Sequence, residues 1–256
     1  MMHAARTTRT PVRMPTRMAW FGTLALAAQL GHLGMAATAQ ADAFDTLERL
    51  SRDQFESLVT NMGSATGYKA LAPGEPLGVL GFDLAAGLSV TETDDEVFEL
   101  AGSDALGTLV VPRLSVQKGL PAGLDIGAYV GAIADSDMTL LGVEGRYAIL
   151  DGGILTPSLG LRLAATRLLG SDELDLENYS AELVLSKGFV MLTPYAGIGI
   201  VRTVGDAKDV ESLDEVSVNE EKLLLGLNVN LGINLGFEAD VSGGNATYSA
   251  KIGFRF

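Results

Sequence analysis

The sequence predicts an all-β protein, an antiparallel transmembrane β-barrel of about ten strands that follows a short N-terminal helix. Three observations predict it: apolar side chains recur at every second residue, the strands are long, and the connections are alternately long and short. The recurrence is clearest from Leu223 to Val241, where odd positions are apolar and even positions, apart from Leu224, are mostly Gly, Asn or acidic. This period of two indicates a strand with one apolar and one polar face. In a transmembrane barrel the apolar face meets lipid and the polar face lines the interior, whereas in a soluble β-sandwich the apolar face would cover a core.

The first 41 residues predict a secretory signal peptide. A stretch whose charges are all Arg ends at Arg17, an apolar run extends from Ala19 to Leu30, and Ala39 and Ala41 form a small-residue cleavage pattern. A membrane anchor is the alternative, but the run is about a dozen residues long and a spanning helix needs roughly 20. The remaining chain has no apolar run of about 18 residues that would predict a spanning helix. It is therefore expected to be periplasmic, secreted or an outer-membrane barrel.

The composition excludes several classes of protein. The 256-residue chain has no Cys, which excludes a disulfide framework and a zinc–thiolate site. Its net charge of −14 and its 6% of aromatic residues argue against a nucleic-acid partner. Both histidines, His3 and His32, fall within the signal peptide, so the mature chain lacks the usual base for a Ser or water nucleophile. We expect no enzyme and no cofactor; a site based on Lys or carboxylates is the remaining enzymatic alternative.

Residues 42–76 are expected to form a helix and a linker. Apolar side chains fall near one helical face over residues 42–62, Asp45 and Glu48 have nearly the spacing of a capping box, and Gly63 suits a helix end. Turn-forming residues then continue to residue 76. The helix could lie in the periplasm or fill the barrel mouth as a plug, because its apolar face has to be covered.

Residues 77–256 are expected to form the barrel. Ten strands are predicted at residues 79–90, 106–118, 123–134, 138–149, 154–168, 175–187, 190–204, 219–230, 232–241 and 246–256. Strands of this length can cross a bilayer at a tilt, whereas strands of soluble proteins average about 5–6 residues. The barrel is therefore preferred to the sandwich.

The connections predict the orientation of the barrel. Every second connection is long or acidic, and together these hold 20 of the 32 acidic residues; the others are short turns. Bacterial outer-membrane barrels have long loops outside and short turns in the periplasm. With an even number of strands, both ends of the barrel are expected on the periplasmic side.

The last residues suggest an assembly signal. Tyr248, Ile252, Phe254 and the terminal Phe256 share the apolar face with Ala250. This ending resembles the β-signal by which outer-membrane barrels are recognised, which implies the barrel-assembly machinery as a partner. Residues 42–256 also resemble a family of proteobacterial outer-membrane barrels, through "GFDL" at 81–84 and "KGLP" at 118–121. That family has no assigned activity, so the resemblance implies fold and location in the bacterial outer membrane.

The polar face directs charged side chains into the lumen. The ten predicted lumen charges are Asp83, Arg113, Asp125, Glu144, Arg146, Arg162, Glu182, Glu238, Lys251 and Arg255. Buried charges need partners, and we expect Glu144 to pair with Arg162 and Arg146 with Asp125. The set would either fill and stabilise the barrel or form the selectivity constriction of a small pore.

Three classes of function stay open after this, with an outer-membrane enzyme a distant third. A narrow channel for uptake of small solutes is placed first, and a structural or surface-binding barrel with a filled, salt-bridged lumen is the alternative. The acidic connections lack the spacing of a calcium loop. They are expected to be a solvated surface, with loose divalent-ion bridging to lipopolysaccharide as the alternative. Membrane lipid is the expected partner of the apolar face.

Overall fold

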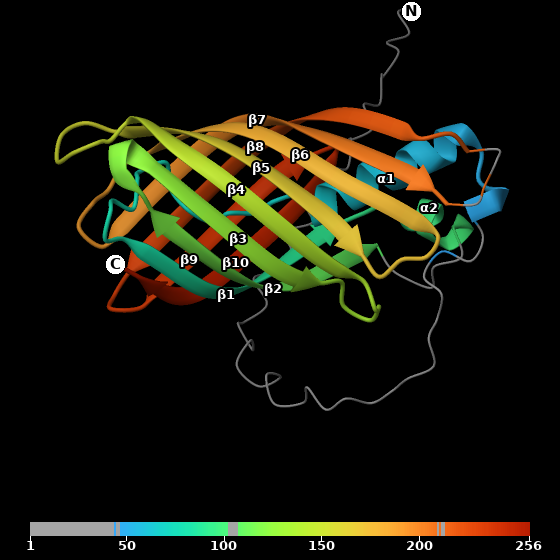
Figure 1. Ribbon diagram of the computed structural model, residues 1–256, viewed down its shortest axis with the longest axis horizontal. Helices are drawn as coiled ribbons and strands as arrows, with labels where there is room; N and C mark the ends of the chain where they lie inside the picture. Colours follow the sequence, from blue (N-terminus) through green and yellow to red (C-terminus); the bar gives the residue numbers. More distant parts are fainter. Residues whose placement is uncertain (1–43, 45–46, 102–106, 209, 211–212) are drawn as a thin grey trace, which may run out of the picture. The chain divides into compact units, whose positions relative to one another are not determined.

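The computed structural model describes residue 44 and residues 47–101, 107–208, 210 and 213–256. Its strands are β1 (Phe82–Glu92), β2 (Thr108–Gly119), β3 (Leu124–Ala132), β4 (Thr139–Leu150), β5 (Ser158–Leu169), β6 (Leu174–Ser186), β7 (Leu192–Ala207), β8 (Val216–Asn230), β9 (Asn234–Ser242) and β10 (Asn245–Arg255). Each pairs antiparallel with the next, and β1 pairs with β10 to close the barrel (Figure 1). The predicted fold is confirmed, and every strand end lies within four residues of its predicted position. The predicted signal peptide lies outside the described residues.

The N-terminal helix differs from the prediction of residues 42–62, of which 42, 43, 45 and 46 are outside the described residues. A 3-10 turn, η1 (Leu47–Arg49), is followed by α1 (Arg52–Thr66). The helix begins after Ser51 because Ser51 and Gln54 form a capping box, each side chain accepting a hydrogen bond from the other residue's backbone N–H. The predicted stop at Gly63 is wrong. A Cβ atom there would overlap Thr203 of β7, so this glycine lies within the helix and permits α1 to pack closely against the barrel wall.

Two short helices were not predicted. In the β1–β2 connection, α2 (Asp95–Leu100) begins after Asp94, whose side chain accepts a hydrogen bond from the N–H of Glu96 at 3.1 Å. Val97 and Phe98 are buried, which anchors this part of the acidic connection to the barrel core. A 3-10 turn, η2 (Pro121–Gly123), joins β2 to β3.

The two faces of the barrel wall differ as expected for a transmembrane barrel. On β8, Leu223 and Leu225 point outward and are 62% and 68% exposed, while Lys222 and Leu224, on the opposite face of the strand, are buried. The same alternation continues around the barrel, so its outer surface is largely apolar. None of the described helices has both the length and the apolar character needed to cross a membrane.

The main hydrophobic core lies inside one mouth of the barrel. Figure 1 shows α1 and α2 at the end opposite the C-terminus. Phe55, Leu58, Val59 and Met62 of α1 are fully buried, and α1 contacts strands from several sides of the barrel, including β1, β6, β8 and β10. The helix thus closes the mouth that carries the long connections.

Candidate functional site

Residues 67–77 occupy the lumen between α1 and the end of the barrel that carries the short turns. We call these residues the lumenal segment. This segment joins α1 to the turn before β1, and its first seven residues, 67–73, are all buried. The tip of α1 also contacts the wall, since the Thr66 carbonyl accepts hydrogen bonds from Tyr129 and Thr166 at 3.3 and 3.1 Å. The lumen therefore holds a buried segment of the chain rather than an open channel along these residues.

Side chains of the barrel wall bind the backbone of the lumenal segment. Six consecutive carbonyls, from Tyr68 to Pro73, each accept a hydrogen bond from a different inward-pointing side chain. The donors, in carbonyl order, are Lys222 (3.2 Å), Arg113 (3.3 Å), Gln117 (3.4 Å), Asn228 (3.0 Å), Arg162 (2.8 Å) and Arg146 (3.5 Å). These buried carbonyls would otherwise lack partners, since the segment forms no sheet ladder.

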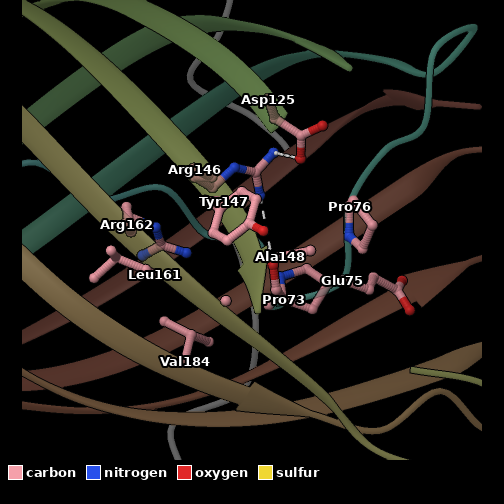
Figure 2. Close-up of a pocket in the computed structure, with 12 residues that line it drawn as sticks. Pro73, Glu75, Pro76, Asp125, Arg146, Tyr147, Ala148, Leu161, Arg162 and Val184 are labelled. Atoms are coloured by element: carbon pink, nitrogen blue, oxygen red, sulfur yellow. Dashed lines mark hydrogen bonds and ion pairs between the residues drawn. The ribbon is translucent and has the colours of Figure 1, made fainter. Parts of the chain in front are cut away.

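The lumenal segment leaves the lumen at the end that carries the short turns. Figure 2 shows Arg146 between the Asp125 carboxylate and the Pro73 carbonyl. The backbone N–H of Leu77 donates to both oxygens of Asp125, at 3.1 and 3.2 Å, and that of Gly74 donates to Ser186. The cavity in Figure 2 has a volume of about 10 Å³, which leaves room for about one water molecule.

The side chains of the ten charged residues predicted from strand parity are all buried within the barrel. One row of ion pairs runs from β3 to β8, and its separations in order are 3.2, 3.8, 3.5, 2.7 and 2.8 Å. The row is Asp125, Arg146, Glu144, Arg162, Glu182 and Lys222. It includes both pairs that the sequence suggested, Glu144 with Arg162 and Asp125 with Arg146.

A second group of charges lies where β1 meets β10. Asp83 pairs with Lys251 at 2.7 Å and lies 3.6 Å from Arg255. Arg255 also reaches Glu75 of the lumenal segment at 3.9 Å. The wall and the segment are thus joined by charge as well as by carbonyl bonds.

The other two predicted lumen charges are held by uncharged groups. Arg113 donates to Ser89 at 2.9 Å and stacks over the Tyr129 ring, 5.0 Å from its centroid. Glu238 accepts a hydrogen bond from the Tyr195 hydroxyl at 3.0 Å.

Sequence reasoning missed three charged residues of the lumen. Lys69 pairs with Asp240 at 2.6 Å, and both side chains are buried. Lys222 and Asp240 share the inward parity of Glu238, so the alternation of their strands could have revealed them. Lys69 lies in the linker, where no periodicity indicates which way a side chain points.

Glycines let some of these side chains reach across a strand. Gly199 lies in register between Glu182 and Lys222, and a Cβ atom on it would come within 2.7 Å of the Glu182 side chain. The pair therefore forms over β7, across a residue without a side chain. The ion pair is therefore a reason for glycine at this inward position.

The chemistry of the site is that of peptide-backbone binding. Guanidinium, ammonium and amide donors face consecutive carbonyls of the lumenal segment, and carboxylates hold three of these donors, Arg146, Arg162 and Lys222, in place. Among the described residues no cluster of His, Asp or Glu has the arrangement of a metal site. The described lumen is thus a binding site that is filled by the chain itself.

The C-terminal residues close the barrel. Phe256 and Phe82 exchange backbone hydrogen bonds of 3.0 and 2.7 Å, and their rings lie 6.0 Å apart. The side chains proposed as the assembly signal, Tyr248, Ile252, Phe254 and Phe256, are all more than half exposed on the outer face.

Comparison with known proteins finds structural likeness only. No protein-family model and no curated protein matches the sequence. The N-terminal β-barrel domain of Pseudomonas aeruginosa OprF is 11% identical, with a TM-score of 0.36 over 70% of this chain and 99% of that one. KdgM porin is 10% identical, with a TM-score of 0.35 over 68% and 99%. Ail, the attachment invasion locus protein of Yersinia pestis, is 10% identical, with a TM-score of 0.31 over 69% and 98%. The fold assignment therefore rests on the strand pairing of this chain.

Proposed function

We propose that this protein is an outer-membrane β-barrel that is closed by its own N-terminal region and serves as a structural or surface-binding barrel. The observation that carries the proposal is the row of six consecutive carbonyls, Tyr68 to Pro73, bound by six side chains of the wall. The sequence placed a narrow uptake channel first. We now prefer the alternative, because a solute path needs a continuous opening and the lumenal segment occupies that space.

The fit between segment and wall also supports a closed lumen. Gly74 lies against β5 and β6, and a Cβ atom on it would overlap the carbonyl oxygen of Val184. On the wall, a Cβ atom on Gly160 would come within 2.7 Å of the Gly74 carbonyl oxygen. Both contacts leave no space for solute between the segment and this side of the barrel.

Single-channel recording tests the closed lumen. The purified mature protein, reconstituted in planar bilayers, is expected to give no resolved conductance steps under conditions where an open porin gives them. Steps that change with Arg146→Ala, inside the lumen, and not with Arg202→Ala, which is exposed on β7, would assign a pore to this barrel and overturn the proposal.

The apolar exterior supports location in the outer membrane, with lipid acyl chains as the partner of the wall. The protein is expected in the outer-membrane fraction and is expected to be heat-modifiable, so that folded and boiled samples migrate differently on a gel. Recovery of unmodified protein in the soluble periplasmic fraction would contradict this location.

The proposed orientation of the barrel in the outer membrane follows from the lengths of the connections between its strands. With long loops outside, the exposed acidic side chains of those loops face the lipopolysaccharide, and divalent ions could bridge the two. Washing cells with a chelator should then loosen lipopolysaccharide from the folded protein in a pull-down. Retention of the same amount after chelation would count against ion bridging.

A further inference from the structure

Three contacts fix α1 at the end of the long connections. Asn61 accepts a hydrogen bond from the Asp94 N–H at 3.0 Å, Ser64 donates to the Ser242 carbonyl at 2.7 Å, and Arg52 lies 3.6 Å from Asp214. Asp94 follows β1, Ser242 ends β9, and Asp214 lies between β7 and β8, so all three belong to the same mouth.

The chain reappears at the opposite end of the barrel. Leu77 is bound by Asp125 near the start of β3, and Lys118, near the end of β2, donates to the carbonyls of Val79 and Gly81 at 2.6 and 3.1 Å. Residues 67–81 between α1 and β1 number fifteen and can extend to roughly 50 Å. The apolar belt of such a barrel is about 25 Å tall, so this length is sufficient for one crossing through the lumen.

We propose that the mature chain is threaded through its own barrel, so that α1 is exposed on the cell surface while the C-terminus stays in the periplasm. The chain would cross the membrane once inside the lumen and ten times in the wall. The lumen then acts as a tunnel that holds a segment of the polypeptide and presents the preceding helix to the outside. The surface location rests on the orientation in the proposed function, whereas the threading rests on the lumen contacts alone.

The types of contact between the wall and the lumenal segment support the threading. The wall binds carbonyl oxygens, which every residue carries, and four of the six donors are charged: Lys222, Arg113, Arg162 and Arg146. Lys69 adds a buried ion pair from the segment to the wall. A helix withdrawn into the periplasm would give up all of these contacts, together with the core around Phe55 and Met62.

Single-cysteine labelling tests the threading. Because the chain has no Cys, only the introduced residue can be labelled. Three exposed positions serve as reporters: Glu56→Cys on α1, Asp137→Cys in the β3–β4 connection, and Leu155→Cys, at a residue 91% exposed, in the β4–β5 turn. Each variant is first checked for heat-modifiable migration, and intact cells are then treated with a membrane-impermeant maleimide.

Labelling of Glu56→Cys and Asp137→Cys in intact cells, with Leu155→Cys labelled only after the outer membrane is permeabilised, is the expected result. Labelling of Asp137→Cys alone in intact cells would place α1 on the side of the short turns and overturn the threading. Labelling of Leu155→Cys alone would overturn the surface location and attribute the failure to the orientation, since the other two positions would still share one side.

Discussion

The substitution Arg162→Met tests whether the lumen is a packed and paired interior. Arg162 is 2% exposed and donates to Glu182 at 2.7 Å and to the Ala72 carbonyl at 2.8 Å, and it lies 3.5 Å from Glu144. Methionine fills much of the same volume without the charge. The change therefore removes the centre of the ion-pair row while leaving the wall glycines and their packing untouched.

The expected loss is large because the partners stay behind. Removing one member of a buried ion pair costs about 3–5 kcal/mol, since it leaves an uncompensated charge. Glu144 would keep Arg146 at 3.8 Å, and Glu182 would keep Lys222 at 2.8 Å. Because both carboxylates keep one cation, we expect the loss of stability to lie in the lower half of that range. The lost hydrogen bond to the Ala72 carbonyl adds about 1 kcal/mol. We expect a loss of about 4 kcal/mol in the free energy of unfolding.

A matched control lies on the same strand. Arg167 pairs with Glu177 at 3.5 Å, and their side chains are 57% and 36% exposed, so Arg167→Met is expected to cost 0 to about 1 kcal/mol. The assay is urea unfolding of the mature protein in lipid vesicles, followed by the gel mobility of folded and unfolded forms. Fluorescence is less suitable because the one Trp, Trp20, belongs to the predicted signal peptide. With a slope of about 2 kcal/mol per M, the midpoint for Arg162→Met should fall by about 2 M.

A double variant separates lost pairing from lost packing. Arg162→Met combined with Glu182→Met removes one charge of each sign, so its loss should be smaller than the sum of the single losses by about 1–3 kcal/mol. Equal midpoints for Arg162→Met and Arg167→Met would refute the reasoning, because they would mean that the lumen charges are hydrated. A strictly additive double variant would refute the pairing of these two residues.

Three further predictions address the segment, the cap and the C-terminus. Gly74→Ala should lower the unfolding midpoint, because its methyl group meets the Val184 carbonyl, whereas Gly145→Ala, with open space around it, should not; equal midpoints would contradict the close fit. Ser51→Ala should cost about 1 kcal/mol through loss of the α1 cap, and a midpoint equal to that of the native protein would mean that the helix start is not held there. Deletion of Phe256 should reduce the membrane yield of heat-modifiable protein, and an undiminished yield would argue against an assembly signal.

The parts of the fold that the sequence predicted are those with a local physical cause. Period-two alternation assigns each strand residue to a face without knowledge of its neighbours, which is why the inward positions of residues such as Glu144 and Arg146 could be derived. Adjacent antiparallel strands also limit the partners, so that Arg162 could be named for Glu144 before the register was known. The register then places Arg146 directly opposite Arg162, so Arg162 reaches Glu144 diagonally. On their other sides, Asp125 lies directly opposite Arg146 and Glu182 directly opposite Arg162.

The lumenal segment could not be predicted because its causes are not local. Residues 67–77 have no period, and turn-forming residues such as Gly74 and Pro76 usually indicate an exposed loop. Their glycine and small side chains reflect close approach to the wall, which only the closed barrel reveals. The predicted end of the helix was wrong for a similar reason. Gly63 is needed because it packs against Thr203, a residue 140 positions later in the chain.

The pairing of the wall argues that the lumenal segment is part of the folded barrel rather than a detachable gate. Asp240 obtains its buried cation from Lys69 of the segment, and Arg113 relies on the Lys69 carbonyl as well as on Ser89. Withdrawal of the segment would therefore leave buried charges to be hydrated on several strands at once. The Leu and Phe side chains of α1 would lose their core in the same step. Most charges of the wall pair among themselves, but Asp240 takes its cation from the segment, and the segment's carbonyls accept hydrogen bonds from six side chains of the wall. The arrangement therefore favours permanent closure and a helix held at the mouth.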